Sequence, residues 1–254
     1  MNYTFQVAYL NTIKQKKLIP KNVIQEIENN KNFTYLISVL KEYKYNKIFS
    51  FTTSEIAIIK PTNFEDVLQT ELKESLELID SLLLPKHKWF TNFFLFFLNP
   101  TEIYSTNFVS FFEHYNKLFN QLGSTLCKKL FTLIVDFENI KLFLSYITIQ
   151  KSLQELVFIP YGSMDEKKFR QIFPSVENLN KYLYYSSYPK TKVSVLPQDE
   201  NFNFYFNYYL EELVWQSKFF YFTIEPIIFY FFEKLVEIQE LKRIYYIIKE
   251  VKAV

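Results

Sequence analysis

The sequence predicts an all-α fold built from long antiparallel helices. Only two glycines occur in 254 residues, and the tight turns of β-hairpins depend on Gly-containing dipeptides. Apolar side chains recur at steps of three and four over long stretches. Prolines fall between those stretches, where they end one helix or begin the next. These observations argue against a fold with many hairpins.

The apolar periodicity and the breaks place the helices in order along the chain. We expect them at residues 3–17, 21–30, 33–45, 63–84, 101–122, 124–153, 164–172, 175–187 and 200–217, with a last helix from Thr223 almost to the C-terminus. Its apolar stripe is Ile228, Phe231, Leu235, Ile238, Leu241, Tyr245 and Ile248, and the opposite face carries Glu233, Lys234, Glu237, Glu240 and Lys249. This pattern predicts an amphipathic helix.

Two strongly apolar segments are too short to cross a membrane. They are residues 89–98 and 219–232, and the second is interrupted by Glu225 and Pro226. A spanning helix needs about 20 mainly apolar residues. We expect both segments to be buried or interfacial.

The residues that carry most enzyme chemistry are missing or isolated. With glycine only at 123 and 162, the chain holds no glycine-rich phosphate loop. His87 and His114 have no Cys or His at ligand spacing, so no zinc site is expected. Cys127 is the only cysteine, which excludes an intrachain disulfide and favours an intracellular compartment. We expect no catalytic residue, no cofactor and no metal.

Charge is balanced overall but uneven along the chain. The formal net charge is +2, too small for a protein that neutralises many phosphates. Residues 1–60 hold nine Lys and four Glu, whereas residues 62–80 hold six acidic residues and one Lys. Two interpretations remain open: solvated helix faces, or a basic face that meets an acidic partner. The lysines of that second interpretation include Lys14, Lys16, Lys17, Lys21, Lys41, Lys44 and Lys47.

Weak internal repeats predict a duplicated helical unit. Leu18-Ile19-Pro20 and Phe158-Ile159-Pro160 are each followed by a short helix and then a second one. In a second pair of segments, Val135, Lys141, Ile147 and Lys151 recur as Val236, Lys242, Ile248 and Lys252, and Asp136 corresponds to Glu237. We expect two related units, residues 1–130 and 131–254, arranged as a funnel or bundle.

Three passages resemble one family. They are Asp136 to Lys141 followed by Ile159-Pro160-Tyr161-Gly162, the segment from Val176 to Tyr188, and Ile224-Glu225-Pro226 with Tyr230, Glu237, Leu241, Lys242 and Ile244. On these residues the chain resembles the C-type stalk protein of bacterial and archaeal V/A-type rotary ATPases, whose counterpart in the vacuolar enzyme is the d-type stalk protein. Members of the family usually contain three such units, whereas two are visible in this sequence.

The resemblance implies a non-catalytic part of the central stalk. Such a part links the rotating shaft to the membrane proteolipid ring, on the cytoplasmic face of the membrane and without a membrane span of its own. The matched polar positions are Asp136, Asn139, Lys141, Glu237 and Lys242, which either contact the shaft or form a buried structural network. Lys14, Lys16, Lys17, Lys41 and Lys44 are further candidates for partner binding.

Two other functions remain open on the sequence. One is a non-enzymatic helical scaffold in another large complex, for instance an organellar one. The other is a peripheral membrane protein that uses residues 90–98 as an interfacial segment.

Overall fold

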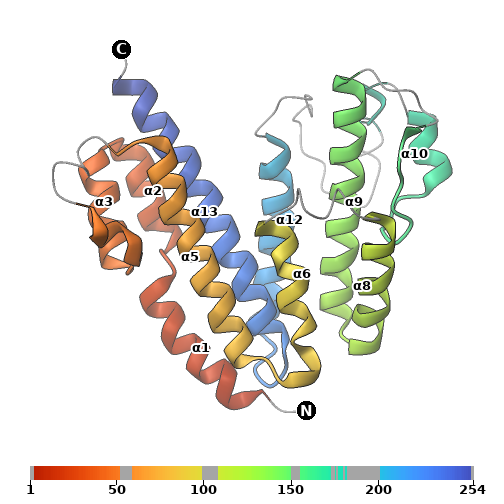
Figure 1. Ribbon diagram of the computed structural model, residues 1–254, viewed down its shortest axis with the longest axis horizontal. Helices are drawn as coiled ribbons and strands as arrows, with labels where there is room; N and C mark the ends of the chain where they lie inside the picture. Colours follow the sequence, from red (N-terminus) through yellow and green to blue (C-terminus); the bar gives the residue numbers. More distant parts are fainter. Residues whose placement is uncertain are drawn as a thin grey trace. The chain divides into compact units, whose positions relative to one another are not determined.

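The computed structural model describes residues 3–51, 59–98, 108–149, 155–172, 175, 177–179, 181 and 201–252, and within them the regular structure is entirely helical. The all-α prediction is confirmed. The chain forms two compact units, the first made of Met1–Asn99 with Val214–Val254 and the second of Pro100–Leu213 (Figure 1). No described helix has both the length and the apolar character that crossing a membrane requires.

The first unit brings the two ends of the chain together. From the N-terminal part it contains α1 (Thr4–Lys17), α2 (Lys21–Asn30), α3 (Phe33–Glu42), the 3-10 helix η1 (Asn46–Ser50), α5 (Pro61–Leu82), the 3-10 helix η2 (Pro85–His87) and α6 (Trp89–Leu98). From the C-terminal part it contains α13 (Glu225–Lys252). The helix α12 (Asn201–Ser217) passes from the second unit into the first at residue 214.

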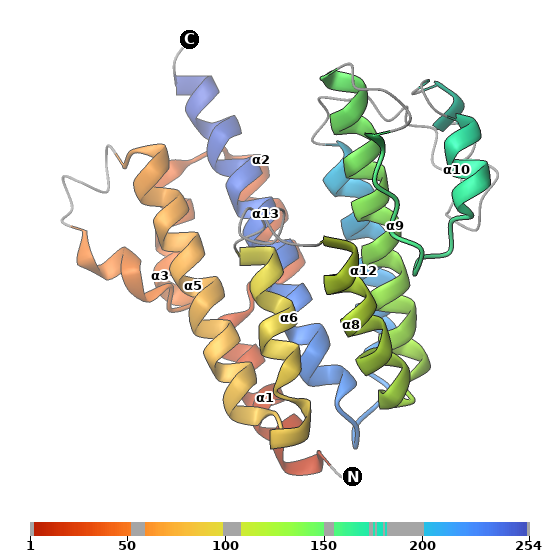
Figure 2. The same ribbon diagram turned by 45° about the vertical axis from the view of Figure 1, so that its right-hand side comes forward.

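Helix α13 is the centre of the first unit, and α5 lies beside it in antiparallel orientation (Figures 1 and 2). The ring of Phe64, near the start of α5, stacks on Tyr245, near the end of α13, at 4.1 Å between centroids. Helix α6 also packs on α13, where the ring of Phe94 stacks on that of Phe231 at 4.4 Å between centroids. Because several elements cover α13, the side chains from Ile227 to Phe232 are fully buried.

Local sequence explains where the helices of the first unit begin and end. Pro61 and Pro226 lie in first turns, where a missing N–H costs no hydrogen bond. The side chain of Asn32 caps α3 by accepting from the N–H groups of Thr34 and Tyr35. Helix α3 ends earlier than predicted because Lys44 adopts the left-handed conformation, with φ of 59°.

The end of α3 is a Schellman motif with lysine at the left-handed position. The N–H of Tyr45 donates to the carbonyl of Leu40, and the N–H of Lys44 donates to that of Lys41. Glycine usually occupies this position because it has no Cβ. The turn reverses the chain direction and carries the side chain of Tyr45 into the interior, where it is fully buried.

The second unit is organised by α9 (Thr125–Thr148), which forms a hairpin with α8 (Phe108–Leu122). Gly123 joins the two with φ of 73°, and the Ser124 side chain caps α9 by accepting from the N–H of Cys127. Aromatic side chains fill the space around α9: Phe131 lies 4.8 Å from Phe119 of α8 between ring centroids. Further along α9, Phe137 contacts Phe206 of α12, and Phe143 contacts Phe169 of α10 (Glu166–Ile172).

The predicted helices agree closely with the described ones, and the structure shows where the two strongly apolar segments lie. Residues 89–98 form a helix, α6, whose Phe90, Phe93, Phe94 and Phe96 are buried, so this segment is core and not an interfacial surface. The segment 219–232 divides, since residues 219–222 are exposed and residues 224–232 are buried. The compact units divide the chain after Asn99 and after Leu213, and the predicted pair of related units, residues 1–130 and 131–254, stays a prediction. Most of the helix expected at 175–187, and parts of those expected at 101–122 and 124–153, lie outside the described residues.

Candidate functional site

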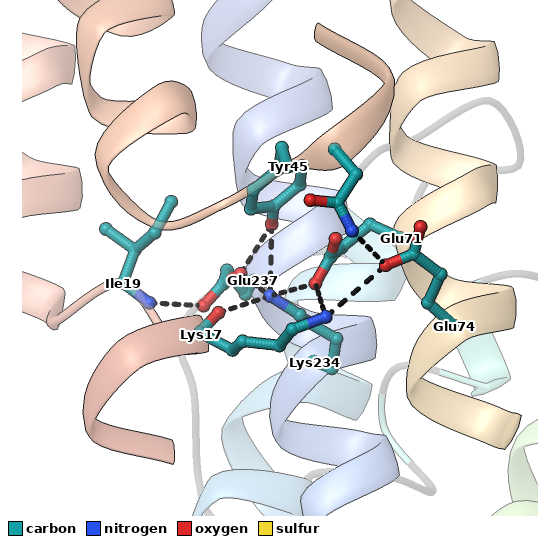
Figure 3. Close-up of polar contacts among 8 residues, drawn as sticks. Lys17, Ile19, Tyr45, Glu71, Glu74, Lys234 and Glu237 are labelled. Atoms are coloured by element: carbon teal, nitrogen blue, oxygen red, sulfur yellow. Dashed lines mark hydrogen bonds and ion pairs between the residues drawn. The ribbon is translucent and has the colours of Figure 1, made fainter. Parts of the chain in front are cut away.

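The most prominent polar feature of the first unit is a buried ionic network on α13. Lys234 is fully buried, and its ammonium lies between two buried carboxylates, 2.7 Å from Glu237 Oε1 and 3.3 Å from Glu71 Oε1 (Figure 3). It also donates to the carbonyl of Lys17 at 2.6 Å. Burying a charge is costly unless it is paired and hydrogen-bonded, and Lys234 meets both conditions.

Glu237 joins three separate elements through one carboxylate. Its Oε2 accepts from the backbone N–H of Ile19 at 2.7 Å, in the connection between α1 and α2. Its Oε1 accepts from the hydroxyl of Tyr45, which the turn after α3 directs inward, and from Lys234. Burial and the adjacent negative charge of Glu237 raise the pKa of the Tyr45 hydroxyl well above its usual range, which keeps this hydroxyl protonated as a donor.

Glu71 attaches α5 to the same network. Its carboxylate is buried, and burial raises its pKa, although the neighbouring charge of Lys234 acts in the opposite direction. Lys17 lies 4.0 Å from Glu71 and 3.3 Å from Glu74, and Glu74 also accepts from the side chain of Asn46 (Figure 3). The network therefore passes from the interior to the partly exposed edge of α5.

The second unit contains a different buried polar clamp, in which α9 holds the loop that precedes α10. Asn139 is buried and makes two bonds with Ile159: it accepts from the N–H at 2.8 Å and donates to the carbonyl at 3.0 Å. Asp136, also buried, accepts from the N–H groups of Ser163 and Met164 at 2.8 and 3.1 Å and from the Ser163 hydroxyl. Four donors and one acceptor of the loop are satisfied by two side chains.

Gly162 is needed because the loop passes directly over Asp136. A Cβ at position 162 would lie 2.0 Å from Asp136 Oδ1 and 3.1 Å from Val135 Cγ1. No side chain fits at those distances, and the neighbouring atoms belong to a buried helix. One of the two glycines of the chain is thus explained by a close approach.

The two units share one feature of this chemistry. In each, an isoleucine that precedes a proline donates its backbone N–H to a buried polar side chain of a long helix: Ile19 to Glu237 and Ile159 to Asn139. The acceptors are not at equivalent positions, since the repeat relates Glu237 to Asp136. The parallel favours the predicted internal relationship, which stays a prediction.

The remaining matched lysines are engaged on the surface of their own unit. Lys141 pairs with Glu138 one turn away, and Lys242 pairs with Glu65 of α5 at 2.7 Å. Of the N-terminal lysines, Lys14 pairs with Glu233, Lys17 with Glu74 and Lys47 with Asp66. Part of the basic N-terminal segment therefore pairs with acidic residues of α5 and α13 in the same chain. Lys16, Lys41 and Lys44 are exposed.

The sequence analysis identified Glu237 as a candidate site residue. It did not identify the other buried members of its network, Lys234, Glu71 and Tyr45. It placed Lys234 and Glu237 on a polar face opposite the apolar stripe, whereas the structure buries both. A signal was present in the sequence: residues 227–232 are apolar on every face, so a helix continuing from them is enclosed. Charged residues within such a helix need partners, but the sequence does not say which ones.

We predict that Lys234→Met destabilises the first unit by about 3–5 kcal/mol, because two buried carboxylates lose their cation. The matched control is Lys242→Met on the same helix, which breaks a half-exposed pair with Glu65 and should cost about 0–1 kcal/mol. Urea unfolding followed by circular dichroism measures both variants.

The loss in Lys234→Met should depend on pH with a defined sign. Removing Lys234 raises the pKa of Glu71 further, so the folded state favours the protonated carboxyl. The penalty is then largest at neutral pH and above, and it shrinks as pH falls toward the ordinary range of Glu. Equal penalties at acidic and neutral pH would contradict this assignment.

We predict that Gly162→Ala destabilises the second unit by about 2–4 kcal/mol, because the added methyl displaces the loop and breaks the bonds to Asp136. Gly123→Ala is the control: its added Cβ meets open space, and only the positive φ is unfavourable, at about 1 kcal/mol. If the free energies of unfolding of the two variants differ by less than about 1 kcal/mol, the loop can shift to accommodate the methyl group at little cost, which would contradict the prediction.

A comparison with known protein families matched the second unit and most of the C-terminal helix. A family model described as ATP synthase (C/AC39) subunit matches residues 99–250, which is more than half of the chain and includes α9, the clamped loop and nearly all of α13. Neither a curated protein nor a solved structure gave a significant match. Members of the family are stalk proteins of V/A-type ATPases and do not carry the catalytic sites. The chain belongs to the ATP synthase (C/AC39) family, which comprises the C-type and d-type stalk proteins of V/A-type ATPases.

Proposed function

We propose that the chain is a central-stalk component that links the rotating shaft of a V/A-type ATPase to its membrane proteolipid ring. The observation that carries the proposal is the family match over residues 99–250, which includes Asp136, Asn139 and Glu237 at the centres of the two polar clusters. In this role the protein works at the cytoplasmic face of the membrane, held there by its partners.

The packing within each unit suits a part that transmits force. A protein under torque must keep its helices in register, and apolar contacts alone permit small sliding movements between helices. The Lys234 network fixes α13 to α5 and to the connections that follow α1 and α3, through bonds with defined directions. In the second unit, Asp136 and Asn139 fix the loop to α9 in the same manner.

These internal bonds narrow the choice of residues that contact a partner. The side chains of Asp136, Asn139 and Glu237 form hydrogen bonds with backbone groups of their own unit. We therefore assign them the role of maintaining the fold of that unit and not of contacting a partner. The exposed lysines Lys16, Lys41 and Lys44 are better candidates for contact with an acidic or polar partner surface. Lys14 and Lys17 are half-buried in ion pairs and contribute less to such a surface.

Purification from native membranes tests the proposal. The full chain with an affinity tag, extracted in mild detergent, should bring down the catalytic subunits, the shaft proteins and the proteolipid together. Depletion of the chain should abolish ATP-driven ion pumping, while ATP hydrolysis by the detached catalytic sector persists. Recovery of a different complex without any ATPase component would overturn the proposal in favour of the scaffold alternative.

We predict that the triple variant Lys16→Glu, Lys41→Glu and Lys44→Glu weakens recovery of the complex in a salt-dependent manner. Each exposed pair contributes only about 0–1 kcal/mol and is screened over roughly 8–10 Å at physiological salt, so three changes together are needed. The control is Lys128→Glu, Lys129→Glu and Lys167→Glu, three exposed lysines of the second unit. Both variants should keep the wild-type helicity and melting temperature. Normal assembly of the first variant at low salt would identify these lysines as ordinary solvated residues.

A further inference from the structure

One end of the first unit exposes a cluster of aromatic side chains. The connection between α12 and α13 carries Phe219, Phe220, Tyr221 and Phe222, which are 60, 40, 58 and 62% exposed. Trp215, at the end of α12, is 60% exposed and contacts Phe219 edge to face at 4.8 Å between ring centroids. Single exposed aromatics are normal on protein surfaces, but a contiguous group marks an interaction site. We call these five residues the aromatic tip.

The aromatic tip is held in place by hydrogen bonds. Successive turns connect Lys218, Phe219 and Phe220 to the carbonyls of Trp215, Gln216 and Ser217. The N–H of Tyr3 donates to the carbonyl of Phe222 at 3.0 Å. The exposed rings are therefore presented on a fixed backbone, which reduces the entropy lost when they bind.

Tyr3 connects this turn to the turn between α5 and α6. Its hydroxyl accepts from the N–H of Leu84 at 3.2 Å and lies 2.7 Å from His87 Nδ1. His87 is half-buried, and burial followed by the charge of Lys86 lowers its pKa. Figure 1 shows both turns and the N-terminus at the same end of the first unit. Phe5, on the first turn of α1, is 79% exposed.

The charged residues around the aromatic tip are mainly basic. Lys86 and Lys88 on the neighbouring turn and Lys218 at the base of the tip are exposed. Two acidic residues of this end are occupied or enclosed: Asp80 accepts from Lys88 at 2.8 Å, and Glu225 is buried. Glu212, one turn before Trp215, is exposed. The Lys88–Asp80 pair is neutral, which leaves Lys86 and Lys218 as exposed cations beside the rings against Glu212 as an exposed anion.

We propose that the aromatic tip inserts into the headgroup region of an anionic phospholipid bilayer. Trp and Tyr prefer the boundary between water and hydrocarbon because one end of each side chain is apolar and the other polar. Phe adds apolar area that can enter the acyl boundary, and lysines attract anionic headgroups. Protein interfaces are also enriched in aromatic residues but depleted of lysine, whereas Lys86 and Lys218 are exposed beside these rings. The inference rests on the proposed function only for bringing the chain to a membrane, and it adds a lipid contact to the protein contacts.

Binding to protein-free vesicles tests the aromatic tip directly. The chain has two tryptophans, so Trp89→Phe leaves Trp215 as the sole reporter. With vesicles of phosphatidylcholine containing about 30% phosphatidylglycerol, we expect co-sedimentation of the full chain and a blue shift of Trp215 emission. Phe219→Ser with Phe222→Ser should weaken binding by about tenfold or more, because both rings lose apolar contact. Lys86→Glu with Lys218→Glu should weaken it on anionic vesicles and leave pure phosphatidylcholine unaffected.

The matched control is Phe49→Ser, which removes a ring that is 59% exposed on η1 and should leave vesicle binding unchanged. Unchanged helicity and urea midpoints verify that all variants fold. The proposal is overturned if the wild-type chain fails to bind anionic vesicles, or if the Phe219, Phe222 variant binds as the wild type does. A concentration-dependent dimer that this variant abolishes, without vesicle binding, also overturns it and assigns the tip to a second copy. Because the vesicles contain no protein, these outcomes are independent of the co-purification test.

Discussion

The first unit depends on the pairing of one buried ammonium with two buried carboxylates. An unpaired charge at the position of Lys234 would be too costly to bury, so α5 must supply Glu71 and α13 must supply Glu237 at the same point. Their geometry then fixes the connection after α1 and the turn after α3, because Ile19 and Tyr45 use the remaining acceptor capacity of Glu237. The ionic network adds specificity of register to a core that is otherwise aromatic and aliphatic.

In the second unit, a buried carboxylate and a buried amide hold a non-helical segment against a long helix. Asp136 and Asn139 lie one turn apart on α9, so both face the loop between residues 159 and 164. In both units a backbone segment that forms no helix is held by helix side chains, which satisfies polar groups that burial would otherwise leave unpaired. The family match covers the second unit and most of α13, which includes Lys234 and Glu237. Their partners in the network, such as Lys17 and Glu71, precede residue 99 and lie outside the match.

This use of polar residues changes how the candidate partner-binding set is interpreted. Asp136, Asn139 and Glu237, which lie within the family match, serve the interior of their own unit, and we assign them to keeping its shape. We propose that contacts with other molecules involve exposed residues, namely the lysines Lys16, Lys41 and Lys44 and the rings of the aromatic tip. Charged surfaces give salt-dependent, distributed attachment, while exposed rings give apolar attachment.

The positions of most helices could be predicted from the sequence alone, because the period of the apolar residues and the placement of proline and glycine act locally. Asp136, Asn139 and Glu237 were also identified in advance, through resemblance to a family. The burial of Lys234, the origin of its partners on α5 and in the turn after α3, and the passage of Gly162 over Asp136 emerged only in the tertiary structure. Those facts depend on which distant segments meet, as α5 and α13 do, and a helical period gives the direction of a face but not its partner.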